Sequence, residues 1–211
     1  MSDHSGTASA AIGSAEVDQD RRGFLTFAAA ATGAVGVAFA AVPFIASWSP
    51  SERARAAGAP VEVDLTKIEP GQMVMVPYRK RTMYIVHRTP EMLSRIGGHD
   101  ASLKDPSSAS SEQPEYARNP GRALREDFLV LEGTCTHLGC LPKARFDVGA
   151  SPELGASWPG GFFCPCHGSR FDLAGRVFEG SPASQNLRIP VYSYPNEGTL
   201  VIGVDTKTGV A

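Results

Sequence analysis

The sequence predicts a mostly β protein, an antiparallel β-sandwich or partly open barrel, preceded by one transmembrane helix near the N-terminus. Two observations support this expectation. Residues 24–48 carry no charged side chain, and a helix of that length, about 37 Å, is long enough to cross the hydrocarbon core of a bilayer. From Val61 onward, short runs alternate apolar and polar side chains, which is the two-residue period of half-buried strands.

The overall composition favours a loop-rich domain. With 211 residues, the chain is expected to form one folded domain plus an appendage. Its formal net charge of −2 gives no indication of electrostatic binding to nucleic acid. All four cysteines lie between Cys135 and Cys166, and glycine and proline are frequent in the C-terminal two thirds, as in β proteins with many turns.

The N-terminal residues are typical of an exported protein. Residues 1–20 are small, polar and acidic, so we expect a disordered cytoplasmic tail. The adjoining Asp20–Leu25, D-R-R-G-F-L, resembles the twin-arginine export signal, in which two arginines precede a Phe-Leu pair and an apolar stretch. A plainer interpretation is that two arginines before an apolar run only follow the positive-inside rule. Both interpretations place the N-terminus in the cytoplasm and the C-terminal domain on the periplasmic side.

Residues 21–49 are interpreted as a retained signal anchor that crosses the inner membrane once, with a cleaved signal peptide as the alternative. The bulky side chain of Trp48 makes Ala46–Trp48 a poor cleavage site, whereas small-x-small triplets occur within residues 54–59. Residues 50–60 are small and polar, and they are predicted to be a flexible linker that serves as a hinge.

Residues 61–211 are predicted to form the periplasmic domain. We expect one helical turn at 91–96 and a surface insertion at 99–119, which is rich in Ser, Pro, Asp and Glu. His87 and His99 stand alone in the sequence and are interpreted as ordinary surface or strand histidines, and not as ligands. The predicted strands are 61–65, 73–76, 82–86, 128–131, 187–194 and 199–204, with a hairpin turn at 78–81 and a further turn at 196–198.

Two short motifs contain all of the cysteines. They are Cys135–Cys140, C-T-H-L-G-C, and Cys164–Ser169, C-P-C-H-G-S, and each has two cysteines and one histidine. If each motif contributes one Cys–His pair, two cysteines remain, which an exported domain can hold as a disulfide. Two thiolates and two imidazoles suit structural zinc, but zinc fingers usually keep the cysteines together and the histidines together. A Rieske 2Fe–2S cluster needs the mixed arrangement, because two cysteines bind one iron and two histidines bind the other.

The two motifs together resemble those of the Rieske iron–sulfur subunits of quinol–cytochrome c reductases, and the anchor and linker extend this resemblance over nearly the whole chain. The resemblance implies a Rieske-type antiparallel β-sandwich head with a small cluster-binding subdomain at about 126–187, and one 2Fe–2S cluster as cofactor. By position, Cys135 and Cys164 resemble the ligands of the buried iron. His137 and His167 resemble the ligands of the outer iron.

The remaining motif residues also have counterparts in the family. Cys140 and Cys166 resemble the disulfide that ties the two cluster loops together. Ser169 resembles the hydroxyl that donates a hydrogen bond to a cluster sulfur. Gly139 and Gly168 suit loops whose backbone amides approach the cluster closely.

Two positions depart from the family pattern. In many ubiquinol-oxidising members a tyrosine stands two places after the motif serine, whereas this chain has Phe171. Because donors near the cluster sulfurs stabilise the reduced state, Phe171 predicts a reduction potential in the middle of the Rieske range. The proline loop, often G-P-A-P in the family, is Gly180–Ser184, G-S-P-A-S, and has lost one of its two prolines. We expect this loop to cover the cluster with less rigidity.

The resemblance implies an enzyme subunit that is active only within a quinol–cytochrome c reductase complex. Its cluster takes one electron from quinol, with the proton leaving through a histidine ligand, passes the electron to a membrane c-type cytochrome and contributes to the proton-motive force. His167 is the expected principal quinol contact, with His137 as the alternative. Leu138 is expected at an exposed tip that contacts the quinol site or the cytochrome. The implied partners are cytochrome b and the c-type cytochrome within a dimeric complex, and no nucleic acid.

Other protein classes stay open on the sequence alone. An arsenite oxidase small subunit also carries a twin-arginine signal, and co-purification with a molybdenum subunit instead of cytochrome b would identify it. Ring-hydroxylating oxygenases have Rieske domains too, but these generally lack the disulfide pair and the anchor. An exported zinc domain would be colourless and contain one zinc. A complex that oxidises plastoquinol in place of ubiquinol is a closer alternative.

Overall fold

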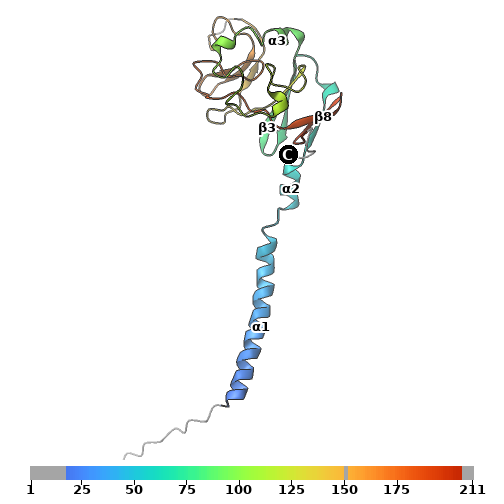
Figure 1. Ribbon diagram of the computed structural model, residues 1–211, viewed down its shortest axis with the longest axis vertical. Coiled ribbons are helices and arrows are strands. Elements are labelled where there is room, and N and C mark those ends of the chain that lie inside the picture. The colour runs from blue at the N-terminus through green and yellow to red at the C-terminus, as the bar shows by residue number, and fades with distance from the viewer. Residues whose placement is uncertain (1–17, 150–151, 206–211) are drawn as a thin grey trace, which may run out of the picture. The chain divides into compact units, whose positions relative to one another are not determined.

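The computed structural model describes residues 18–149 and 152–205. The chain divides into two compact units, residues 1–51 and residues 52–211. Within the described residues, the first unit contributes one long helix, and the second contains the β-strands (Figure 1). These elements confirm the predicted fold class, an N-terminal apolar helix followed by a mostly β domain.

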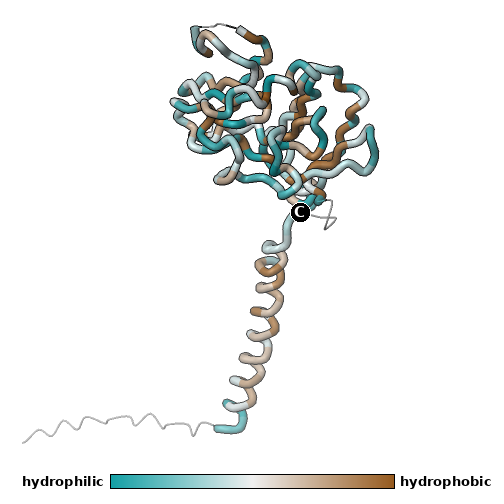
Figure 2. Tube along the Cα trace, turned by 45° about the horizontal axis from the view of Figure 1, so that its top comes forward, coloured by the Kyte–Doolittle hydropathy of each residue, from teal (hydrophilic) through white to brown (hydrophobic). Residues whose placement is uncertain are grey.

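Helix α1 (Gln19–Ala46) covers most of the segment 21–49 that is predicted to cross the membrane. It begins where the Asp18 side chain accepts hydrogen bonds from the amides of Asp20 and Arg21, and it ends in the turn that follows Pro43. None of its side chains is buried, and apolar residues extend along the helix beyond its first turn (Figure 2). By length and composition, α1 is therefore able to cross a membrane.

A second helix, α2 (Glu52–Gly58), lies within the segment predicted as a flexible linker. Its local structure differs from that prediction. Glu52 and Arg55 form an ion pair one helical turn apart, and the alanines at 54 and 56 have high helix propensity. Short-range propensity thus orders most of this segment as a helix.

Within its described residues, the second unit contains three antiparallel sheets of three strands each. Their strand orders are β1-β9-β8, β2-β3-β4 and β5-β6-β7. The strands are β1 (Val61–Asp64), β2 (Met73–Tyr78), β3 (Arg81–His87), β4 (Phe128–Glu132), β5 (Lys143–Arg145), β6 (Gly161–Cys164), β7 (Ser169–Phe171), β8 (Tyr192–Asn196) and β9 (Thr199–Ile202). The short helical elements are α3 (Pro90–Ser94), η1 (Leu65–Lys67), η2 (Asp100–Ser102) and η3 (Glu115–Ala117).

The hydrophobic core lies around β3 and β4. Every residue of β4 is buried, and Ile85 of β3 has no exposed surface, like Leu129 and Leu131 of β4. β3 is the middle strand of its sheet, and β4 leads directly into the first cysteine motif. A fully buried strand therefore positions the start of the motif loop.

The β2–β3 hairpin confirms the prediction, and its turn is strained. Tyr78 pairs with Arg81 as the last pair of the ladder, and only Arg79 and Lys80 connect the strands. Both connecting residues have positive φ angles, 47° and 64°. Glycine and asparagine adopt this left-handed conformation readily, whereas side chains such as arginine and lysine adopt it at a cost.

The last two strands are shorter than predicted. The segment predicted as strand 187–194 becomes a strand only at Tyr192, because its first residues have no single partner strand. The backbone of residues 187–189 bonds to three different segments, at Gly175, Glu112 and Glu132. Pro190 has no amide to donate. Strand β9 ends at Ile202, before the predicted end at 204, because Gly203 turns the chain with a φ of 93°.

Candidate metal centre

The two cysteine motifs occupy loops beside the small sheet β5-β6-β7. The first motif lies between β4 and β5, and the second lies between β6 and β7. Cys164 is the last residue of β6 and Ser169 is the first of β7, and these two residues pair across the ladder. The second motif is therefore a tight hairpin loop with both ends held in a sheet.

Both motif loops contain the same backbone turn. The amide of Gly139 donates a 2.9 Å hydrogen bond to the carbonyl of Cys135, and the amide of Gly168 donates a 2.9 Å hydrogen bond to the carbonyl of Cys164. The two glycines have φ angles of 84° and 76°, and no neighbouring protein atom lies closer than 4.0 Å to a Cβ placed on either. Glycine is therefore favoured at both positions because the turn needs a positive φ angle, and not because a side chain would collide with neighbouring protein atoms.

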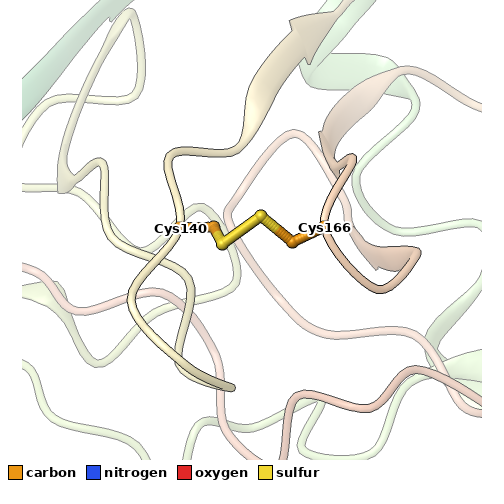
Figure 3. Close-up of a disulfide and its surroundings, with 2 residues drawn as sticks. All are labelled: Cys140 and Cys166. Carbon is orange, nitrogen blue, oxygen red and sulfur yellow. A yellow bond between two sulfur atoms is a disulfide. The ribbon is translucent and has the colours of Figure 1, made fainter.

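A disulfide joins the two motif loops. The sulfur atoms of Cys140 and Cys166 are bonded at 2.12 Å, and the residues are 26 positions apart in the sequence (Figure 3). This is the pair that the family resemblance implies. Closing a loop of this length restricts the unfolded chain and contributes about 3.5 kcal/mol to stability.

Cys135 and Cys164 are free thiols, and each is only 2% exposed. Their side chains are in hydrogen-bonding contact, and the sulfur of Cys135 also accepts hydrogen bonds from the His137 amide and the Ser169 hydroxyl. Burial raises the pKa of the Cys135 thiol and the Cys164 thiol raises it further, whereas the two donors act in the opposite direction. Adjacent buried thiols with donors aimed at sulfur suit a metal that stabilises both thiolates.

The motif histidines lie nearer the surface than the thiols. Their rings are perpendicular, with centroids 4.8 Å apart. His167 is exposed and His137 is half-buried. The Nδ1 atom of His137 is buried and has no hydrogen-bond partner among the described residues. A buried ring nitrogen without a partner is costly unless it binds a ligand, so this atom suits a metal bond.

These four side chains fit a Rieske cluster, because two buried thiols suit one iron and two outer imidazoles suit the other. A different trio, Cys140, Cys164 and Cys166, brings its sulfur atoms within 4.8 Å of one another. That trio is not a metal site, because the disulfide leaves it only one thiolate.

Ser169 is fully buried, and a backbone amide sets the orientation of its hydroxyl. Its Oγ accepts a 3.1 Å hydrogen bond from the amide of Ala183, so its own proton is directed to the Cys135 sulfur. Phe171 is also fully buried, in the same apolar core as Cys135 and Cys164. Its ring has no hydroxyl, so the tyrosine donor of many family members has no counterpart at this position.

Two leucines, and not one, form the exposed apolar tip of the first motif loop. Leu138 is 71% exposed, as expected for a tip residue, and Leu141 is 54% exposed. The family motif predicts an exposed residue only at Leu138. Leu141 lies directly after the disulfide residue Cys140, and this position in the sequence is the only feature from which its exposure could have been predicted.

Among the described residues, two histidines lie outside the motifs, and both have partners within the protein. Nδ1 of His87 lies 2.7 Å from the carbonyl oxygen of Ile68, and Nε2 of His99 lies 3.2 Å from the carboxylate of Asp172. Burial opposes ionisation of Asp172, but hydrogen bonds from His99 and Arg176 lower the pKa of this carboxyl overall. Both histidines therefore have hydrogen-bond partners within the protein and lie outside the metal centre.

Comparison with known proteins gives consistent matches. The family model described as "Ubiquitinol-cytochrome C reductase Fe-S subunit TAT signal" matches residues 7–51, and the Rieske [2Fe-2S] domain model matches residues 115–195. The ubiquinol-cytochrome c reductase iron-sulfur subunit of Allochromatium vinosum is 51% identical over 189 residues, which cover 90% of this chain and 91% of that protein. The subunit of the same name from Bradyrhizobium diazoefficiens is 41% identical, over 87% and 94% of the two chains.

Among solved structures, one named "Hyperthermophilic respiratory Complex III" matches with a TM-score of 0.47 and 24% identity, covering 83% of this chain and 98% of the other. The sequence matches confirm the predicted twin-arginine signal region and the 2Fe–2S cofactor. With relatives this similar over almost their full length, the chain belongs to the Rieske iron–sulfur subunits of ubiquinol–cytochrome c reductase.

Proposed function

We propose that this chain carries electrons from quinol to a c-type cytochrome through a Rieske cluster held by Cys135, Cys164, His137 and His167. The main support for the proposal is the difference in burial between the proposed ligands. Both thiols lie in the interior, whereas the ring of His167 is exposed. When bound, the cluster supplies a one-electron acceptor and makes the attached imidazoles more acidic.

His167 is the residue that meets quinol in this proposal. Its exposed ring is accessible to a substrate hydroxyl, so a ring nitrogen accepts a hydrogen bond from quinol and then takes the proton as the electron leaves. His137 is the alternative, but its ring is half-buried, whereas that of His167 is exposed. Leu138 and Leu141 supply an exposed apolar surface on the neighbouring motif loop, where a quinol ring or a cytochrome surface can pack.

The family and α1 support the proposed partners and location. In the proposal, the complex is dimeric and includes cytochrome b and a membrane c-type cytochrome, and electron transfer contributes to the proton-motive force. The paired arginines keep the N-terminus in the cytoplasm, so α1 crosses the inner membrane and the β domain acts in the periplasm. Residues on either side of α2 serve as the hinge about which the domain moves between its two electron-transfer partners.

The first test is the electron paramagnetic resonance spectrum of the purified protein after mild reduction with ascorbate. A rhombic signal with an average g below the free-electron value is expected. Substituting Cys135→Ser or His137→Gln should abolish the signal, whereas His87→Gln should retain it, because His87 has a backbone partner. Protein that is silent after both ascorbate and dithionite and full of zinc would contradict the assignment.

A second test addresses the apolar tip. Leu138→Ala should slow quinol oxidation in the assembled complex while leaving the spectrum of the cluster unchanged, because an exposed side chain is not needed for the fold. Leu124→Ala is the matched control, since Leu124 is also exposed but lies outside the motif loops. Equal turnover in both variants would show that the tip does not contact the partner or the substrate.

A further inference from the structure

The loop Gly180–Ser184 is attached to β7 by hydrogen bonds near the metal centre. The amide of Ala183 donates to Oγ of Ser169 at 3.1 Å, and the amide of Arg170 donates to Oγ of Ser181 at 3.1 Å. Ser181 and Ala183 are buried, while Pro182 is exposed. The position of the Ala183 amide therefore decides which lone pair of Ser169 is occupied and where the Ser169 proton points.

Lys104 holds this loop from a distant part of the sequence. Its Nζ donates hydrogen bonds of 2.6 Å to the carbonyl of Ser181 and 2.9 Å to the carbonyl of Ala183. These carbonyls lie on either side of the peptide that joins Pro182 to Ala183. Because the donor is an ammonium group, both hydrogen bonds are charge-assisted and stronger than neutral ones.

The backbone around Lys104 is itself fixed. The amide of Lys104 donates to the carbonyl of Val177 at 3.0 Å, and Leu103 forms an antiparallel bridge with Phe178. The ammonium group therefore reaches the loop from an anchored position. This anchoring matters because Ser184 stands where the family pattern leads us to expect a second proline, which would restrain the loop covalently.

We propose that Lys104 is a positioning residue for the metal centre. It fixes the Ala183 amide, the amide fixes the Ser169 hydroxyl, and the hydroxyl donates its proton to the Cys135 sulfur. This inference rests on the proposed role of Cys135 as a cluster ligand. A donor held on a ligand sulfur stabilises the reduced, more negative state, so Lys104 keeps the reduction potential higher than a mobile loop would allow.

The test is a reduction-potential titration, followed by electron paramagnetic resonance, on the full chain in its complex. Lys104→Met keeps a long unbranched side chain but removes all three donors. We expect it to lower the equilibrium constant for reduction about tenfold, which is 59 mV for a one-electron couple. Lys104→Arg should recover most of the loss, since a guanidinium can also donate to both carbonyls. Lys143→Met, at an exposed position of β5, is the control for removing one positive charge and should leave the potential unchanged.

A double-mutant cycle separates positioning from simple electrostatics. In a Ser169→Ala background, Lys104→Met should have no further effect on the potential, because the hydroxyl through which Lys104 acts is gone. An undiminished effect in that background, or a wild-type potential in Lys104→Met itself, would overturn the inference. Faster hydrogen exchange of the Ala183 amide in Lys104→Met, and not in Lys143→Met, is expected in addition. Absence of any cluster signal in the wild-type protein would instead overturn the proposed function.

Discussion

The hydroxyl of Tyr84 donates a 2.8 Å hydrogen bond to the carbonyl of Pro142, which fixes the far end of the first motif loop to strand β3. The same aromatic ring packs against the near end of the loop, since a Cβ on Gly133 would lie only 2.3 Å from it. One core side chain thus contacts both ends of the loop that contains Cys135 and His137.

Replacing this tyrosine should destabilise the domain. Tyr84→Phe leaves the buried carbonyl of Pro142 without its donor, so the free energy of unfolding should fall by about 1–2 kcal/mol. Chemical denaturation of the detergent-solubilised chain measures this change. Tyr194→Phe is the matched control, because the Tyr194 hydroxyl is buried without a partner among the described residues. Its removal should be neutral or stabilising, and equal losses in the two variants would contradict the argument.

Restoring a tyrosine at position 171 should raise the reduction potential. Phe171 lies in the same apolar core as the two free thiols, so a hydroxyl at this position can donate to a sulfur of the centre and stabilise the reduced state. A redox titration of Phe171→Tyr measures the shift. Phe162→Tyr provides the comparison, because Phe162 is equally buried and pairs with Phe171 in the neighbouring strand. An unchanged potential in Phe171→Tyr would mean that the family departure has no electronic effect.

The strained β2–β3 turn should be open to stabilisation. Lys80 has a φ of 64°, so Lys80→Gly removes a left-handed conformation that costs a side-chain residue about 1 kcal/mol. The free energy of unfolding should rise by about that amount. The same substitution at Lys143, within strand β5, should lower stability instead, because glycine weakens a regular strand. A loss of stability in Lys80→Gly would show that its side chain makes contacts worth more than the strain.

The carboxylate of Asp172 should contribute to acid sensitivity. Its pKa is lowered in the folded protein, so its contribution to stability is complete above its unfolded pKa, about 3.9, and is lost as the pH falls through the folded value. Asp172→Asn should therefore flatten the acid limb of the stability curve. It should also cost about 3 kcal/mol at neutral pH, because Arg176 loses its buried partner.

Unfolding curves recorded from neutral to acid pH give both quantities. Asp147→Asn, at an exposed position between the motifs, serves as the control and should leave the curve unchanged. If the free energy of unfolding falls as steeply with decreasing pH in Asp172→Asn as in the wild type, the acid sensitivity arises from other carboxyl groups.

The membrane helix and the ligand motifs could be predicted because each depends on residues close together in the sequence. The apolar composition of 24–48 suffices for a helix like α1, and the alternation of apolar residues predicted the β2–β3 hairpin. The linker and the last strands were less predictable. Helix propensity over 52–58 outweighs the small polar composition, and the partners of residues 187–189 lie on three separate segments that no local pattern indicates.

By itself, the sequence determined which side chains are available for the metal centre, because the spacing of cysteine, histidine and glycine within each motif is local information. Only the tertiary structure decided how deeply each of these side chains is buried and which groups surround the Ser169 hydroxyl. The loop that contacts this hydroxyl is held by Lys104, which reaches carbonyls 77 and 79 positions away. Contacts between residues so far apart in the sequence depend on how whole segments pack against each other. No periodic pattern or short motif in the sequence therefore predicts them.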